Sequence, residues 1–123
     1  MMTLNVIFKN TSYDDTLFSK DAINAVETAI FMKSVKGTDV PYIKCMVREK
    51  EIKLTPEEAV RQLYIYKLIH EYKYPTTRIQ LETAIHFGRE IKRADITIMD
   101  KDRPTVPYII VELKKPKLTD GKE

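Results

Sequence analysis

Two opposite charges stand at the end of an apolar run in the segment YIIVELKKPK, residues 108–117. Three consecutive β-branched residues, 109–111, predict a buried strand that ends near Glu112. Strand residues two apart point to the same face, so Glu112 and Lys114 should lie side by side, with Leu113 turned to the opposite, core side. A carboxylate and an amine held together at a strand end are residue types that can act on a metal-bound water.

A second carboxylate, Asp95, stands in the preceding strand pattern, in which Ala94, Ile96 and Ile98 alternate with polar or less apolar residues. The polar, proline-marked segment DKDRPTVP predicts a turn between this strand and the next. In such an antiparallel pair the start of one strand lies beside the end of the other. We therefore expect Asp95 to meet Glu112 and Lys114 at one edge of a sheet.

Two carboxylates held close together repel each other, and a divalent cation between them relieves the repulsion. Magnesium prefers hard oxygen ligands and usually keeps several waters, which leaves room for a phosphate oxygen and an attacking water. The ion polarises the phosphoryl group and lowers the pKa of that water. A neighbouring lysine can orient or help to deprotonate the water and stabilise charge on the phosphate. The combination is typical of a hydrolytic phosphodiesterase.

The first part of the chain offers weaker patterns. Residues 3–10, TLNVIFKN, alternate weakly and favour a first strand. Ser19 as N-cap, apolar residues at helical spacing and Gly37 as C-cap predict a helix at about 20–36. Two extended segments, 40–47 and 52–54, indicate either a strand pair or an irregular extended segment.

The clearest element is a helix over 55–72. Thr55 is its predicted N-cap, Pro56 takes the first helical position, and Glu58 stands three residues after the cap, as in a capping box. The helix should end before Pro75, because the residue before a proline is pushed out of the α region.

Three strand patterns follow the helix, at 79–87, 94–99 and 108–112. The order of helix and three strands predicts an α+β protein with helices packed against a sheet. In the strand predicted at 79–87, alternate residues should point to opposite faces. One face would carry Ile79, Leu81, Thr83, Ile85 and Phe87, and the other Gln80, Glu82, Ala84 and His86.

Composition bounds the function classes. The chain has 123 residues, 43% hydrophobic and 32% charged, and a net charge of +3, which describes one globular domain. Three glycines exclude a Walker A loop and a GxGxxG fingerprint. The single cysteine, Cys45, cannot form an internal disulfide. Without a signal peptide or a membrane-spanning run, we expect a cytoplasmic protein that does not enter a membrane.

The ordered segments LTPEEAVRQ, KRADITIMD and IIVELKKP resemble the PD-(D/E)XK nuclease superfamily. They are most similar to the N-terminal nuclease domain of type I restriction enzyme R (restriction) subunits, and the resemblance covers 52–123. It implies a restriction-endonuclease-like core with a mixed central β-sheet flanked by helices, preceded by an N-terminal extension, 1–51, packed on that core.

The resemblance also implies a site. Asp95 and Glu112 match the family's metal ligands, with the Leu113 carbonyl as a third ligand, and Lys114 matches the catalytic lysine. Glu58 matches the glutamate that the family carries early in its first core helix. The implied activity is magnesium-dependent hydrolysis of DNA, with manganese as a substitute ion, while ATP would serve a separate motor domain.

Glu57 matches the same helix position as Glu58, although less well. The sequence departs from the family's pattern in two places. First, Ala94 precedes Asp95 where proline is usual. Second, the family continues into a helix with a Gln-x-x-x-Tyr motif, and this chain stops at TDGKE, where that helix should begin. We therefore expect a fragment of a larger protein or a truncated gene product.

The implied partners are double-stranded DNA and the methyltransferase and specificity subunits of a restriction-modification complex. Four basic residues are candidates for phosphate contacts, although interspersed acids make a solvated surface the default interpretation: Lys92, Arg93, Lys115 and Lys117.

Other interpretations stay open. Glu112 and Lys114 alone would be an ordinary surface ion pair of about 0.5 kcal/mol, and a capping box alone explains Glu58. The alternative function is a catalytically inactive nuclease-fold module that docks partner restriction-modification subunits. An RNA nuclease or a repair nuclease with the same core is a more distant alternative.

Overall fold

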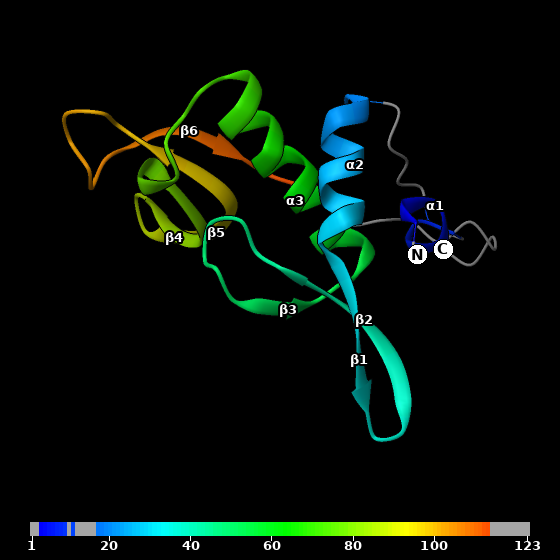
Figure 1. Ribbon diagram of the computed structural model, residues 1–123. Helices are drawn as coiled ribbons and strands as arrows, with labels where there is room; N and C mark the ends of the chain where they lie inside the picture. The colour runs from blue at the N-terminus through cyan, green and yellow to red at the C-terminus, as the bar shows by residue number, and fades with distance from the viewer. Residues whose placement is uncertain (1–2, 10, 12–16, 114–123) are drawn as a thin grey trace.

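Two groups of helical segments, each followed by three strands, make up the described part of the chain in the computed structural model, which describes residues 3–9, 11 and 17–113. The predicted α+β class is confirmed, and Figure 1 shows helices α2 and α3 packed beside each other with strands on two sides. The elements are α1 (Leu4–Ile7), α2 (Lys20–Ala29), β1 (Ile30–Val35), β2 (Thr38–Lys44), β3 (Glu51–Lys53), α3 (Pro56–Tyr66), the π-helix η1 (Lys67–Glu71), the 3-10 helix η2 (Thr76–Arg78), β4 (Ile79–Phe87), β5 (Glu90–Met99) and β6 (Pro107–Val111).

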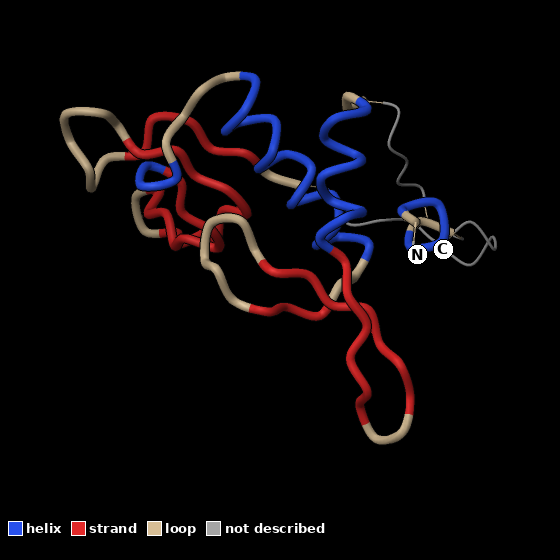
Figure 2. Tube along the Cα trace, in the orientation of Figure 1, coloured by secondary structure: helices blue, strands red, loops and turns tan. Residues whose placement is uncertain are grey.

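The described strands form two separate three-stranded sheets, β1-β2-β3 and β4-β5-β6, in which every pair is antiparallel (Figure 2). The family resemblance implied one mixed central sheet instead. The difference has a simple cause, because consecutive strands in each sheet are joined by short connections. Parallel pairing needs a crossover of a dozen or more residues. The strand pair predicted at 40–47 and 52–54 is confirmed as β2 and β3.

Two predictions for the N-terminal part are wrong. The strand expected at 3–10 is the short helix α1, because Leu4 and Phe8 stand at helical spacing and are both buried in the same core cluster. The helix expected at 20–36 does begin after the Ser19 cap, but it ends at Ala29.

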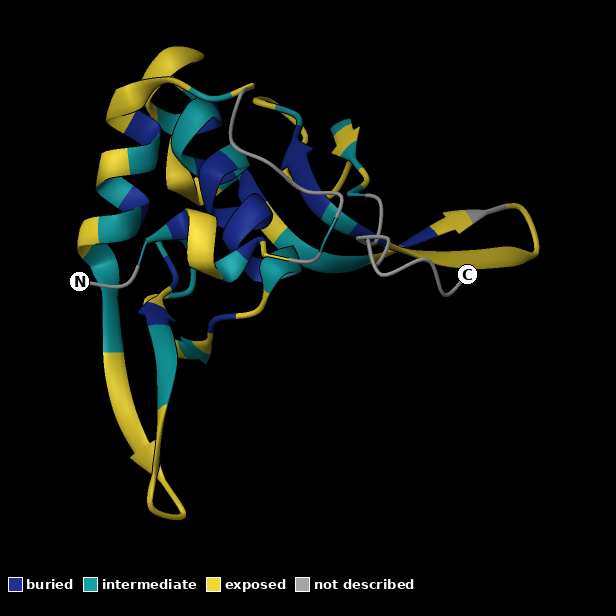
Figure 3. Ribbon diagram, turned by 90° about the vertical axis from the view of Figure 1, so that its right-hand side faces the viewer, coloured by how far each residue is buried: buried dark blue, intermediate teal, exposed yellow. Residues whose placement is uncertain are grey.

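The early end of α2 follows from the hairpin that comes next. β1 pairs with β2 from Ile30 opposite Ile43 to Val35 opposite Thr38. Lys36 and Gly37 connect the strands with φ of +51° and +81°, as a two-residue type I′ turn requires. Gly37 is therefore a hairpin residue and not a helix cap. The tip of this hairpin projects from the rest of the molecule and is exposed (Figure 3).

The helix predicted over 55–72 is confirmed as α3 continued by η1. The Thr55 hydroxyl oxygen accepts the Glu58 N–H at 3.1 Å, and Pro56 takes the first helical position. Among the described residues, no helix is both long enough and apolar enough to cross a bilayer.

Helix α3 contributes to two clusters of buried apolar residues. Its Leu63 side chain belongs to the cluster formed with α1, α2 and Ile43. Its Ile65 side chain and η1 belong to the cluster that includes Ile96 and Ile98 of β5. This double contact fixes α3 across one face of the second sheet, which is where the candidate site lies. The division into an N-terminal extension and a nuclease-like core stays a prediction.

The second sheet follows the predicted order of strands and turns. β5 pairs with β4 and β6, and the Asp100 carboxylate caps the β5–β6 turn by accepting the N–H groups of Asp102 and Arg103 at 3.1 and 3.0 Å. The pattern predicted a strand from Ala94, whereas β5 already begins at Glu90.

The predicted face alternation of β4 breaks at Glu82. This residue has φ of +53°, which is unfavourable for any residue other than glycine. Its carboxylate contacts Arg61 of α3, and the hydroxyl of Thr83 donates to the Gln80 side chain at 3.3 Å. Thr83 therefore lies with Gln80, contrary to the predicted faces, and the left-handed turn of the backbone at Glu82 is the reason.

Candidate functional site

Asp95 of β5 lies at the centre of the candidate site, between Glu82 of β4 and Glu112, the residue that follows β6. Leu81 pairs with Ile96 and Thr83 with Ala94, so the register sets Glu82 opposite Asp95. On the other side, Ile96 pairs with Val111, so the next residue, Glu112, also stands opposite Asp95. The antiparallel pairing predicted for the two strands is confirmed. By continuation of the register, Glu82, Asp95 and Glu112 form a row of three acids.

The Asp95 carboxylate is held by the backbone at the end of β6. Its Oδ2 accepts the Leu113 N–H at 2.7 Å, a short hydrogen bond to a charged acceptor. The Leu113 side chain packs against the first core cluster, so its predicted core-facing orientation is confirmed. The Leu113 carbonyl as a metal ligand stays a prediction. Glu112 is exposed to solvent.

Glu58 is buried, with 9% of its side chain exposed, and both of its carboxylate oxygens have partners. Oε1 accepts from Arg61 Nη1 at 3.0 Å and Oε2 accepts from Gln62 Nε2 at 2.9 Å. Gln62 in turn accepts the Met46 N–H at 3.2 Å. The N–H of Glu58 takes part in the cap, but its carboxylate does not return to Thr55. A capping box therefore does not explain where the Glu58 carboxylate lies.

Arg61 connects the acids from three elements. Its side chain is 6% exposed, and Nη1 contacts both Glu58 Oε1 at 3.0 Å and Glu82 Oε1 at 3.3 Å. Nη2 makes a longer contact of 3.5 Å to Asp95 Oδ1. A second arginine, Arg48, pairs with Glu82 Oε2 at 3.3 Å. A buried guanidinium surrounded by carboxylates in this way is stable only because its charge is compensated.

The electrostatics favour the charged form of Glu82. Partial burial alone would raise its pKa, but the positive charge of Arg61 and the hydrogen bonds from Arg48 and Arg61 outweigh burial and lower the pKa below its ordinary value. Glu82 is 40% exposed at its side chain, so its carboxylate is accessible to solvent as well as paired.

Some of the carboxylates in the candidate site suit magnesium and others do not. Carboxylate oxygens are its preferred protein ligands, and Asp95 keeps Oδ1 engaged only by the long contact to Arg61. Glu58 fits a metal poorly, because both oxygens accept from buried donors. Among residues 3–9, 11 and 17–113, no three side chains of His, Cys, Asp or Glu are placed to hold a metal ion together.

The basic residues predicted to contact DNA fall into two groups. Lys92 and Arg93 are exposed on β5, and Arg93 Nε donates to the Glu82 carbonyl at 3.1 Å. Three predicted residues lie outside the described part of the chain, so the structure gives no position for Lys114, Lys115 or Lys117.

Arg61, Gln62 and Arg48 were not among the residues that the sequence singled out, and Glu82 was named only as one residue on a face of its strand. One signal was available. Arg61 stands four residues before Ile65 and three after Glu58, which places a charge on the helix face that packs inward. No comparable signal exists for Glu82, because its orientation depends on a positive φ.

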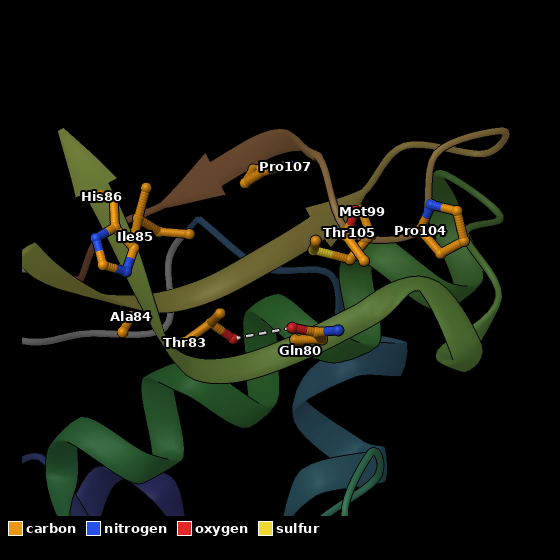
Figure 4. Close-up of a pocket in the computed structure, with 9 residues that line it drawn as sticks. All are labelled: Gln80, Thr83, Ala84, Ile85, His86, Met99, Pro104, Thr105 and Pro107. Carbon is orange, nitrogen blue, oxygen red and sulfur yellow. Dashed lines mark hydrogen bonds between the residues drawn. The ribbon is translucent and has the colours of Figure 1, made fainter. Parts of the chain in front are cut away.

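A separate pocket of about 450 Å³ lies between β4 and the loop that leads into β6 (Figure 4). Gln80 and Thr83 line it from β4, with His86, and Pro104 lines it from the loop. No predicted site residue lines this pocket, and its only titratable lining residue is His86. It is therefore not the candidate site.

Comparison with known proteins finds a family match for the C-terminal part of the chain. The family described as type I restriction enzyme R protein N terminus (HSDR_N) matches residues 56–123, which contain α3, the second sheet and all the predicted metal ligands. No curated protein and no solved structure matches the chain. Because the match covers more than half of its residues, the chain belongs to the family of type I restriction enzyme R protein N-termini.

Proposed function

We propose that this chain is the DNA endonuclease domain of a type I restriction enzyme R subunit, of the PD-(D/E)XK type. The observation that carries the proposal is the register of β5 and β6, which sets Asp95 opposite Glu112 inside the segment that the family matches. Association with an R subunit follows from the family, and phosphodiester hydrolysis is inferred from the acids.

The local charge supports a divalent cation as the cofactor. Glu58, Glu82, Asp95 and Glu112 bring four carboxylates to this region, while Arg48 and Arg61 bring two guanidinium groups. The net charge of these six residues is therefore −2, which is the charge that one magnesium ion would neutralise.

In the proposed site, Asp95 and Glu112 hold the ion through carboxylate oxygens. Bound magnesium would polarise the phosphoryl group and lower the pKa of the attacking water. The Leu113 N–H fixes Asp95 Oδ2, which keeps the carboxylate in one orientation. Lys114 orients that water or takes its proton and stabilises charge on the phosphate. Glu58 acts behind them through its bond to Arg61.

The proposed substrate is double-stranded DNA, bound through phosphates by Lys92, Arg93, Lys115 and Lys117. The proposed partners are the methyltransferase and specificity subunits of a restriction-modification complex, which would supply sequence specificity. ATP would act in a separate motor domain and has no proposed site in this chain.

Cleavage of supercoiled plasmid DNA tests the proposal. With magnesium present, the chain should nick or linearise the plasmid, and chelation of the metal should stop the reaction. Asp95→Asn and Lys114→Ala should each lower the rate at least about 100-fold, the usual scale for losing one acid–base or charge-stabilising group. Arg78→Lys, at the opposite end of β5, is the matched control and should keep the rate.

Absence of cleavage by the wild type, or equal cleavage by Asp95→Asn, would contradict the proposal. RNA of the same sequence, assayed in parallel, distinguishes a DNA nuclease from an RNA nuclease.

One observation favours the alternative function, a catalytically inactive module that docks partner subunits. Arg61 already pairs with three of the acids, as a structural cation would. In that case Lys114→Ala should leave both the fold and the binding of partner subunits unchanged, and no variant should alter DNA cleavage.

A further inference from the structure

We propose that Arg61 is a positioning residue for Asp95, and that Glu82 holds Arg61 in place. The inference concerns how the site is built, and its use in catalysis rests on the proposed function. The starting observation is that one buried guanidinium joins α3, β4 and β5 through Glu58, Glu82 and Asp95.

The contacts of Arg61 divide into an anchoring side and a weaker side. Nη1 is shared between Glu58 and Glu82 at 3.0 and 3.3 Å. Glu58 is itself fixed by Gln62, and Glu82 by Arg48. These partners determine where the guanidinium plane lies.

Nη2, on the weaker side, reaches Asp95 Oδ1 at 3.5 Å, while Asp95 Oδ2 takes the Leu113 N–H at 2.7 Å. The carboxylate is therefore held from two directions, firmly at Oδ2 and loosely at Oδ1. A loosely held oxygen facing a fixed cation keeps its direction and can still accept a second ligand. This is the arrangement that a metal-binding carboxylate needs.

The backbone at Glu82 indicates that its position has a use. A glutamate at φ of +53° is strained, and such strain concentrates at functional sites. What the strained conformation achieves here is visible, because it turns the Glu82 carboxylate from the outer face of β4 toward Arg61. A solvated strand residue would gain nothing from that conformation.

A merely structural role for Arg61 makes a different prediction. If Arg61 only compensates buried charge, its loss should lower the stability of the whole fold without changing the geometry at Asp95 in the molecules that remain folded. If it positions Asp95, the Leu113–Asp95 hydrogen bond should weaken in the folded state.

The test is hydrogen exchange and proton chemical shift of the Leu113 amide by NMR in Arg61→Lys. Lysine keeps the charge but cannot place two separate donors as the planar guanidinium does. We expect the Leu113 amide to exchange roughly tenfold faster, equivalent to about 1.4 kcal/mol of lost protection, and its proton to move upfield. Amides in the paired parts of β5 should keep their protection.

Two further variants complete the design. Glu82→Gln removes the anion that holds Arg61 from β4 and should change the Leu113 amide in the same direction by a smaller amount. If Arg61→Lys does not fold, the Leu113 amide of Glu82→Gln tests whether Arg61 positions Asp95. Arg78→Lys makes the same substitution in an arginine that bonds the Met99 carbonyl at 2.8 Å, and should leave Leu113 unchanged.

An unchanged Leu113 amide in folded Arg61→Lys and Glu82→Gln would overturn the inference. Manganese affinity, measured on the same samples, tests the link to function separately. Because lysine preserves the charge, an approximately tenfold weaker affinity in Arg61→Lys would report geometry and not electrostatic repulsion. The variants could change the Leu113 amide although even the wild-type protein binds no manganese. That result would support the positioning role of Arg61 and contradict the proposed function.

Discussion

Glu58 shows how a local rule can describe a residue correctly and still miss its role. The sequence places it at the third position of a capping box, and its N–H does bond the Thr55 side chain. Its carboxylate instead bonds Arg61 and Gln62, because burial gives it charged and amide donors that outweigh the helix end. The residue type and position were predictable, but the partners depend on tertiary contacts.

The lowered pKa of Glu82 predicts a pH dependence of stability at the scale of one residue. A carboxylate whose folded-state pKa lies below its ordinary value stabilises the fold above the unfolded-state pKa. It loses this contribution as pH falls through the folded-state pKa. Glu82→Gln should therefore be less stable than wild type at pH 7, and the difference should shrink toward pH 3.

Urea unfolding of both proteins at several pH values measures this difference. Asp100, whose pKa is lowered by the N–H groups of Asp102 and Arg103 and by the Arg103 side chain, titrates in both proteins and cancels in the comparison. A Glu82→Gln effect of the same size at pH 7 and pH 3 would be inconsistent with the ion pairs to Arg61 and Arg48.

At the scale of elements, the sequence predicted best those helices and strands that are determined by residues close together in the chain. Helix α3 was predictable from its cap and proline, and the row of Asp95 and Glu112 from two strand patterns joined by a proline-marked turn. The end of α2 was not predictable from helical spacing, because residues 30–35 also fit a hairpin closed at Lys36 and Gly37. Residues 30–35 fit a helix and a strand about equally well by local pattern, and pairing with β2 makes them a strand.

The Thr55 cap gives a prediction at this scale. Thr55→Ala removes the oxygen that accepts the Glu58 N–H, and should lower the free energy of unfolding by about 1 kcal/mol. Thr55→Ser keeps a hydroxyl at the same position and should recover most of that loss. Denaturant unfolding of the three proteins is the measurement. Equal stability of the alanine variant and wild type would mean that the cap contributes little to α3.

At the scale of the whole molecule, the candidate site lies where α3, β4, β5 and the residues after β6 meet. Both core clusters include residues of α3, so the position of the helix relative to the sheet is fixed from two sides. The sequence supplied three of the acids and their order. It could not supply Arg61 as their common partner, because that contact joins residues up to 34 positions apart.

The most direct test of the central claim, that Asp95 and Glu112 bind a divalent cation, is a manganese titration followed by broadening of amide NMR signals. Manganese accepts the same oxygen ligands as magnesium. We predict broadening centred on Asp95, Glu112 and Leu113, lost in Asp95→Asn and kept in Asp102→Asn, which changes an exposed acid in the β5–β6 turn. Broadening scattered over surface acids, or broadening at these residues that persists in Asp95→Asn, would contradict the claim.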